Sequence, residues 1–234
     1  MTLTQAINYI CSIPKTIYCN FRLLPFSQAI KMPLFISWDC KLQKMKKGII
    51  TFAEDVDLKP LLVAIGFNGT EIVPTQKSLI SLESGKLIFK GKANFAKGCV
   101  ISVSGGTLTI GRNFMANKNF FVTCNKEITI GDDALMGWNV LFFDATGHSV
   151  YHNGIKKELY KSIIVGKHVW ICAETHLLKG AHVPDGCVVA YRSLVTGTFD
   201  KRNSLIGGSP ATHMQDNVTW GYSPVEETAD IKPL

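Results

Sequence analysis

Histidine and cysteine are the side chains in this sequence best suited to acid–base, nucleophilic or metal chemistry. His148 and His152 lie four residues apart in a segment without a regular pattern, so their spacing gives no fixed geometry for a metal ion. The seven cysteines are scattered and include no C-x-x-C pair, so neither a zinc site nor a disulfide framework is predicted. Such cysteines are typical of a reducing cytoplasm, where we expect the protein, either free or at the inner face of the membrane.

A repeat of six residues indicates which elements must position these side chains. Between Ile164 and Thr196 an aliphatic residue recurs at every sixth position, at Val165, Ile171, Leu177, Val183, Val189 and Val195. A small or short residue follows each of the first five by four positions, at Val169, Thr175, Ala181, Cys187 and Ser193. Neither an α-helix nor an alternating strand has a period of six. The repeat predicts a parallel β-helix.

In such a fold each unit is a short strand and a corner, and three units close a triangular turn of about 18 residues. We therefore expect three pairs to stack inside the coil: Val165 with Val183, Ile171 with Val189, and Leu177 with Val195. The corners suit compact residues or residues that tolerate a left-handed backbone, here Gly166, Gly180, Gly186 and Gly197. The alternative is a β-sandwich, which would have alternating strands and turns about every 8–12 residues.

The same period occurs upstream, with interruptions. It runs through Phe89, Phe95 and Ile101, resumes after Ser104-Gly105-Gly106, and slips by two residues before Ile130, Met136 and Phe142. It is absent from Phe143 to Ile163, where the chain must leave the coil and return. This excursion, with His148 near its start, is either a functional loop or a tolerated insertion.

These patterns predict three regions. Residues 1–45 form a cap segment with a short helix that Thr4 can cap and that Pro14 limits. Residues 46–205 form the β-helix with the excursion at 143–163, and residues 206–234 form a turn and an acidic tail. Within residues 1–37, apolar side chains surround Lys15, Arg22 and Lys31. This segment either covers the open end of the coil or contacts a membrane or a partner.

Composition places the chain among compact globular proteins, since 46% of its residues are hydrophobic and 18% are charged. The formal net charge of +7 suits an anionic partner or simply aids solubility. No RNA-binding signature, zinc-finger spacing or basic helix indicates nucleic acid. The start of the chain lacks the basic region of a signal peptide, and no apolar run reaches the ~18 residues that span a bilayer.

Three segments carry a family resemblance: ITIGDDALMGWNVLFFDATGHSVY, IIVGKHVWICAETHLLKG and GGSPATHMQDNVTW. In order and spacing they resemble the hexapeptide-repeat O-acetyltransferases, which include galactoside, maltose, capsule and lipopolysaccharide acetyltransferases. The resemblance covers about residues 85–220, and the N-terminal segment looks more like the surface-polysaccharide members. It implies an all-β, left-handed parallel β-helix that forms a homotrimer with active sites between subunits. It also implies acetyl transfer from acetyl-CoA to a sugar hydroxyl of a surface polysaccharide or its precursor, without a metal.

The resemblance assigns roles to four polar residues. His148, in the T-G-H segment, matches the general base, which takes the proton of a weakly acidic sugar hydroxyl as that oxygen attacks the thioester. Asp144 matches an Asp that orients this imidazole or stabilises its charged form; alternatively, it caps its own loop. Asn117 and Asn139 are expected to bind the acceptor, or else to form hydrogen bonds within corners.

The resemblance also indicates where acetyl-CoA binds. Trp170 should point outward beside the acetyl group, and the backbones of Ala173, Ala190 and Tyr191 match positions that contact the pantetheine arm, with Thr196 close by. The chain departs from the family where it has Tyr191 and Arg192 within the usual Gly-Ala-Gly-Ser, and where Gly197 and Thr212 replace common basic residues. Contacts to the coenzyme phosphates are therefore expected from Lys179, Arg192, Lys201 or Arg202.

Two other functions fit the same residues. One is an N-acetyltransferase that acts on an amino sugar or an antibiotic, because the same base could serve an amine. The other is a non-catalytic β-helix used for binding or assembly, against which the excursion bearing His148 argues.

Overall fold

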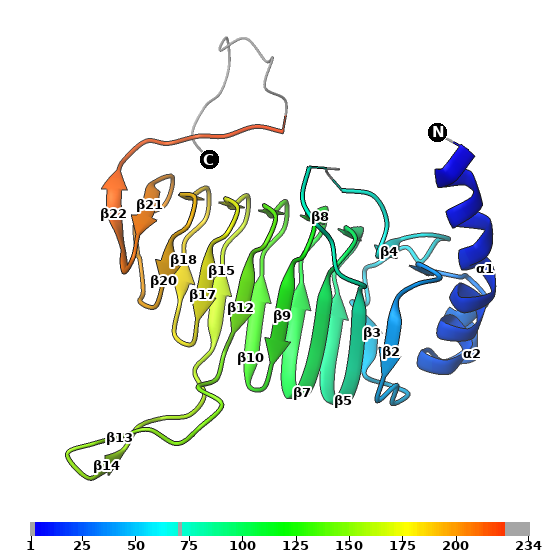
Figure 1. Cartoon of the computed structure of the whole chain (residues 1–234), viewed down its shortest axis with the longest axis horizontal. Coiled ribbons are helices and arrows are strands. Elements are labelled where there is room, and N and C mark those ends of the chain that lie inside the picture. The colour runs from blue at the N-terminus through cyan, green and yellow to red at the C-terminus, as the bar shows by residue number, and fades with distance from the viewer. Residues whose placement is uncertain (1–2, 70–71, 223–234) are drawn as a thin grey trace.

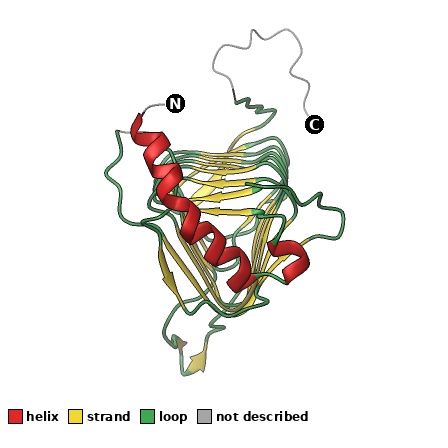
Figure 2. Ribbon diagram, turned by 90° about the vertical axis from the view of Figure 1, so that its right-hand side faces the viewer, coloured by secondary structure: helices red, strands yellow, loops and turns green. Residues whose placement is uncertain are grey.

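The chain forms a three-sided coil whose inside is filled by the side chains at every sixth position. Figure 1 shows this coil from the side, and Figure 2 shows it from its N-terminal end. The computed structural model describes residues 3–69 and 72–222. Parallel strands stack along the coil, so the predicted parallel β-helix of hexapeptide repeats is confirmed.

The strands form three faces. Face one contains β1 (Leu34–Ile36), β4 (Val63–Ile65), β6 (Ala93–Phe95), β8 (Phe114–Ala116), β11 (Leu135–Met136), β16 (Trp170–Ile171), β19 (Val188–Val189) and β21 (Leu205–Gly208). Face two contains β2 (Lys41–Gln43), the first parts of β5 (Leu79–Phe89) and β7 (Val100–Ile110), β9 (Phe121–Cys124), β12 (Leu141–Phe143), β17 (His176–Leu178) and β20 (Leu194–Val195). Face three contains β3 (Ile50–Phe52), the second parts of β5 and β7, β10 (Glu127–Ile130), β15 (Ile163–Val165) and β18 (His182–Val183).

The predicted stacking is confirmed residue by residue. Val165 pairs with Val183 on face three, Ile171 with Val189 on face one, and Leu177 with Val195 on face two. All six side chains are buried. The short residues four positions further on are also buried, and the hydroxyl of Thr175 donates to the Ala190 carbonyl at 3.0 Å. A period of six thus predicted both the inward side chains and the vertical register.

The coil is wider towards its N-terminal end. Phe89 pairs with Ile110 and Ile110 with Ile130, so these turns are longer than the turn from Val165 to Val183. Fully buried aromatic rings occupy the wider turns, with centroids 5.0–6.4 Å apart between successive members of the series Phe89, Phe95, Phe114, Phe120 and Phe142. The extra residues at Ser104-Gly105-Gly106 and before Ile130 therefore enlarge the prism to accommodate phenylalanine.

Two of the four corner glycines adopt the predicted left-handed backbone, with φ of +86° at Gly180 and +70° at Gly186. Gly166 and Gly197 do not have a positive φ. The corner at Gly166 requires a compact residue instead, because a Cβ there would lie 2.5 Å from the backbone nitrogen of Asp185. Gly197 faces open space, so a side chain would fit there.

The N-terminal helix differs from the short helix predicted. Helix α1 (Leu3–Leu23) runs through Pro14, and α2 (Phe26–Ala29) follows it. Pro14 lies on the exposed side of α1, where the carbonyl that loses its hydrogen-bond donor can be hydrated. The coil also begins earlier than residue 46, because β1 and β2 already belong to its faces.

Helix α1 closes the open end of the coil, as Figure 2 shows. Polar residues on its buried side pair with the free edge of β1, and Cys19 and Leu23 beside them pack in the core. Asn20 Nδ2 donates to the Leu34 carbonyl at 2.8 Å, and the Leu34 amide donates to Asn20 Oδ1 at 3.1 Å. The Ile36 amide donates to Thr16 Oγ1 at 3.0 Å, and the Trp38 amide donates to Ser12 Oγ at 2.9 Å. Four residues of helix rise about 6 Å and two residues of strand about 6.6 Å, so the two repeats match.

At the other end, β22 (Ala211–Gln215) runs antiparallel to β21 after a turn, as the Gly-Gly and Pro pattern predicted. The acidic tail from Ser223 lies outside the described residues. None of the helices described for residues 3–69 and 72–222 has the length and apolar character needed to cross a membrane.

Replacing Asn20 by Ala should lower the free energy of unfolding by about 2–4 kcal/mol, because two buried backbone groups of Leu34 lose their partner. Arg22→Ala, on the exposed side of the same helix, is the control and should change it by about 0.5 kcal/mol or less. Urea unfolding followed by circular dichroism measures both. Equal stabilities of the two variants would show that α1 does not hold the end of the coil.

Candidate active site

The residues selected from the sequence lie along three different edges of the prism. The excursion edge, between faces two and three, carries residues 144–162, Lys179 and Thr196. The asparagine edge, between faces one and two, carries Asn117, Asn139, Ala173, Ala190 and Tyr191. The tryptophan edge, between faces three and one, carries residues 166–168 and 201–203, and Trp170 begins the adjoining strand.

Asp144 anchors the point where the chain leaves the coil. Its side chain is fully buried, and its carboxylate accepts hydrogen bonds from three successive backbone amides, those of Asn125, Lys126 and Glu127, at 2.7–3.0 Å. Asn125 Nδ2 donates a further bond to Oδ1 at 3.2 Å. Consecutive N–H groups form a concave site for an anion. The carboxylate therefore binds the preceding turn, and it does not contact the imidazole of His148.

His148 lies on an exposed turn at the base of the excursion. Thr146 Oγ1 donates to the His148 carbonyl at 2.9 Å, and the Thr146 amide donates to the Leu159 carbonyl at 3.1 Å. Beyond this turn the chain forms a hairpin of β13 (Tyr151–His152) and β14 (Ile155–Lys156), which protrudes from the prism in Figure 1. The backbone of His148 is thus held while its ring is open to solvent.

Lysines fix the returning arm of the excursion. Lys126 forms an ion pair with Glu158 at 3.2 Å, and Lys161 approaches the same carboxylate at 3.9 Å. Lys179, one turn further along, donates to the Glu158 carbonyl. Three cations from successive turns therefore surround the base of the loop, and Lys179 lies at the excursion edge. Thr196 is exposed at the same edge.

The two asparagines predicted to bind the acceptor lie on successive turns of the asparagine edge. Asn139 has φ +57° and accepts a hydrogen bond from Asn119 Nδ2 at 2.9 Å, so its side chain links corners. Hydrogen bonding within corners is the alternative role that the sequence predicted for Asn139. Asn117 is half-buried, accepts from the Lys118 amide at 2.9 Å, and lines a pocket on face one.

The same edge continues through Ala173, Ala190 and Tyr191. The Cys172 amide donates to the Val189 carbonyl, and the Ala190 amide donates to the Ile206 carbonyl, both within the ladder. The Tyr191 ring is exposed and lies 5.6 Å from the guanidinium of Arg192, so its bulk points away from the corner backbone. Burial raises the pKa of the Cys172 thiol to about 11, so this thiol stays protonated near neutral pH and is a poor nucleophile.

The tryptophan edge is covered by the segment after β22. Trp170 is 37% exposed and faces outward, as its register predicted, with its ring centroid 6.1 Å from that of Trp220. Trp220 stacks on His168 at 4.3 Å, and its indole donates to the His168 carbonyl. Two of the four predicted phosphate ligands lie on this edge in exposed ion pairs, Lys201 with Asp216 and Arg202 with Asp185. Lys179 lies on the excursion edge, and Arg192 lies on the asparagine edge, where it pairs with Glu174.

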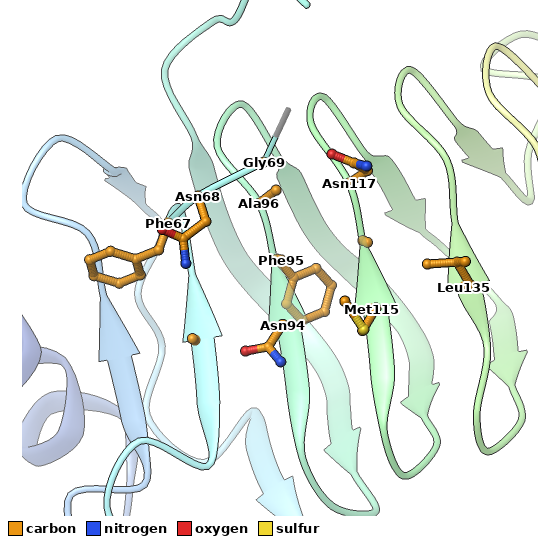
Figure 3. Close-up of a pocket in the computed structure, with 11 residues that line it drawn as sticks. Phe67, Asn68, Gly69, Asn94, Phe95, Ala96, Met115, Asn117 and Leu135 are labelled. Carbon is orange, nitrogen blue, oxygen red and sulfur yellow. The ribbon is translucent and has the colours of Figure 1, made fainter. Parts of the chain in front are cut away.

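A pocket of about 310 Å³ opens on face one and was not predicted (Figure 3). It is lined by the outward side chains of successive strands and by the loop that follows β4: Ala64, Asn94, Met115 and Leu135, with Asn117, Phe67 and Asn68 at its rim. The sequence contained one signal for this pocket, because each outward residue that lines it lies between inward residues of the six-residue repeat. This pocket places polar and apolar groups next to Asn117.

One chain does not bring the predicted residues together. His148 lies at the excursion edge, whereas Trp170, Lys201 and Arg202 lie at or beside the tryptophan edge, with the filled core between them. The backbones predicted to contact pantetheine, those of Ala173, Ala190 and Tyr191, lie at the third edge. A single prism therefore provides parts of a site on separate edges.

No family model matches the chain. The galactoside O-acetyltransferase of Escherichia coli (strain K12) is 37% identical over 94 residues, which cover 39% of this chain and 46% of the relative. The polysialic acid O-acetyltransferase of Escherichia coli O1:K1 / APEC is 28% identical over 134 residues, which cover 56% of this chain and 43% of the relative. The chain thus spans less than half the length of these curated relatives.

A solved structure of a polysialic acid-specific acetyltransferase aligns with 83% of this chain and 92% of its own, at 20% identity and a TM-score of 0.49. The names of the curated relatives confirm the resemblance to O-acetyltransferases that was predicted from the sequence.

Replacing Asp144 by Asn should destabilise the protein by about 1.5–3 kcal/mol, because the successive backbone amides lose a charged acceptor and one of them meets an NH₂ group. Asp200→Asn, at an exposed position, is the matched control and should be nearly neutral. Thermal unfolding measures both. Hydrogen exchange should also rise at the amides of residues 125–127, and unchanged exchange there would contradict the anchoring role.

Proposed function

We propose that the protein transfers an acetyl group from acetyl-CoA to a sugar hydroxyl of a surface polysaccharide or its precursor. The observation that carries this proposal is the long excursion from the coil at residues 144–162, which presents the exposed His148 on an anchored turn. The relatives support the choice of reaction and acceptor, because their names specify O-acetyl transfer to a galactoside and to polysialic acid.

In the proposed reaction His148 acts as general base. The acceptor oxygen attacks the thioester carbon while an imidazole nitrogen of His148 takes the hydroxyl proton. A backbone N–H stabilises the oxyanion that forms, and its collapse breaks the carbon–sulfur bond. The departing sulfur then recovers the proton from the imidazolium. No enzyme nucleophile is required, in keeping with the protonated state of Cys172.

Asp144 is proposed as a positioning residue. Its carboxylate fixes the first residue of the excursion to the turn below, four residues before His148. The imidazole depends on this anchor for its place at the excursion edge. Asp144 thus acts through the backbone and not by a hydrogen bond to the ring.

The groups proposed to bind acetyl-CoA fit its chemistry. Lys179, Arg192, Lys201 and Arg202 offer cations to the phosphates, and their present partners are surface acids or a carbonyl that solvent can replace. Trp170 offers an outward aromatic wall, and the edge that carries Ala173, Ala190 and Tyr191 is proposed to lie along the pantetheine arm. The amide and the carbonyl of Ala190 themselves bond within the coil. Thr196 lies beside Lys179 on the excursion edge.

We further propose that three chains assemble side by side, so that each site combines the excursion edge of one chain with another edge of its neighbour. The separation of His148 from Trp170 within one prism supports this arrangement. Asn117 and the pocket beside it, with Asn139 in a supporting corner, are proposed to contact the acceptor.

Replacing His148 by Ala should lower the turnover of acetyl-CoA by ~10²–10⁴ without altering the fold, because the attacking hydroxyl loses its base. His152→Ala is the matched control, since it removes an exposed imidazole from the neighbouring hairpin and should retain activity. Transfer of radiolabelled acetyl groups to a panel of glycans and lipid-linked sugars measures both variants. Full activity of His148→Ala would remove it as the base.

The label should also be released by mild alkali, because an acetyl ester is hydrolysed under conditions that leave an acetamide intact. Alkali-stable label would indicate an N-acetyltransferase. Failure to bind coenzyme A in calorimetry would indicate a non-catalytic module.

Mixing two inactive variants should restore activity if sites form between chains. With His148→Ala and a disabling Trp170→Ala chain refolded together, random assembly leaves about a quarter of the sites with both groups intact. The mixture should therefore recover about a quarter of wild-type activity, whereas the same variants mixed without refolding should not. No recovery would place both residues in a site within one chain.

A further inference from the structure

An apolar stripe covers the exposed side of α1 and continues onto α2. At 100° per residue, the side opposite the buried Ser12, Thr16 and Asn20 is mainly apolar or aromatic, with Thr4 and Arg22 at one margin. Leu3 is 79% exposed, Ile10 65% and Phe26 71%. The apolar stripe consists of Leu3, Ile7, Ile10, Pro14, Ile17, Tyr18 and Phe21 on α1, with Phe26 and Ile30 from α2.

The polarity of α1 is thus inverted relative to an ordinary surface helix. The polar side chains on the buried side of α1 form hydrogen bonds to the first strand of the coil and to Trp38 just beyond it, and the apolar side chains face outward. The rings of Phe21 and Phe26 lie 6.0 Å apart and join the two helices into one surface. A continuous exposed apolar surface of this kind marks an interaction site.

Exposed cations lie on α1, directly after α2 and in the loop that follows β2. Arg22, Lys31, Lys46 and Lys47 are exposed, and none of them forms an ion pair with the described residues. The loop that holds Lys46 and Lys47 contacts the end of α1, where the Gly48 amide donates to the Leu23 carbonyl at 3.2 Å. The sequence contains no Asp or Glu before Asp39, and the side chain of Asp39 accepts a hydrogen bond from Ser37.

We propose that α1 docks onto the surface of an anionic lipid bilayer, with the apolar stripe in the boundary of the acyl chains and the four cations among the headgroups. A helix with one apolar side, flanking basic residues and too little apolar length to span binds in the plane of the interface. The helix lies across the end of the prism and not along a face (Figure 2), so the coil extends away from the bilayer and its edges stay accessible.

A second copy of the chain fits this surface less well. A two-fold contact through the apolar stripe would bring both sets of four cations together without an acidic residue from the same surface to offset them. Anionic headgroups supply that compensation. This inference is independent of the proposed reaction, because it concerns only the end of the coil.

Vesicle flotation of the full chain tests the proposal. The protein should float with vesicles of phosphatidylcholine and phosphatidylglycerol, bind phosphatidylcholine alone at least about tenfold more weakly, and dissociate as salt is raised. The triple variant Ile7→Gln, Ile10→Gln, Ile17→Gln should lose at least about tenfold in partitioning, because three apolar side chains no longer insert. Arg22→Gln, Lys46→Gln, Lys47→Gln should lose the preference for phosphatidylglycerol.

The matched control is Ile155→Gln, Ile164→Gln, Met214→Gln, which removes three exposed apolar side chains elsewhere and should float like the wild type. Circular dichroism and light scattering check that each variant is folded and has an unchanged mass. Absence of flotation by the wild type, or equal flotation by the stripe variant, would overturn the proposal. A smaller assembly for the stripe variant alone would also overturn it, because a second copy would then cover the stripe.

Discussion

The structure depends on the ladder of parallel backbone hydrogen bonds that joins each turn of the coil to the next. Each strand inside the stack is held by a strand on either side, and the inward side chains fill the space that this ladder encloses. A stack of this kind always leaves an unpaired strand at its beginning. Here Ser12, Thr16 and Asn20 of α1 supply, one helical turn at a time, the donors and acceptors that a preceding strand would have supplied.

The hydrogen bonds between α1 and β1 determine which surface the N-terminal end of the coil exposes. When the polar side chains of a helix form hydrogen bonds to a strand beneath it, the apolar side chains on its opposite side face outward. The arrangement explains why residues 1–37 look like a mixture of cap and contact surface in the sequence. One helix accounts for the mixture, because its buried side covers the end of the coil and its exposed side carries apolar residues.

The coil itself was largely predictable from sequence. A strict period of six fixes which residues point inward, and closing a triangle fixes which of them stack, so Val165 and Val183 could be paired without coordinates. Helix α1 was not predictable, because its length depends on hydrogen bonds to a strand rather than on its own propensity, and Pro14 would end an isolated helix. The role of Asp144 was also not decided by sequence. Its partners are backbone amides of the preceding turn. Nearly every residue type has a backbone amide, so the residue types in the sequence do not reveal this interaction.

The proposed site follows from the same geometry. A prism has three edges, and residues that lie next to each other in a family motif are placed on different edges by a six-residue period. In the proposed site His148 therefore meets the outward Trp170 across a boundary between chains. Within its own chain the anchored excursion holds the backbone of His148 in place, and we propose that the neighbouring chain provides the other groups.

The most direct measurement is a crystal structure of the protein with coenzyme A bound. Our account places the sulfur atom of the coenzyme within hydrogen-bonding reach of the His148 ring of one chain, with its pantetheine arm against an edge of the adjoining chain. A coenzyme bound to one prism alone, or with its sulfur far from His148, would contradict the account.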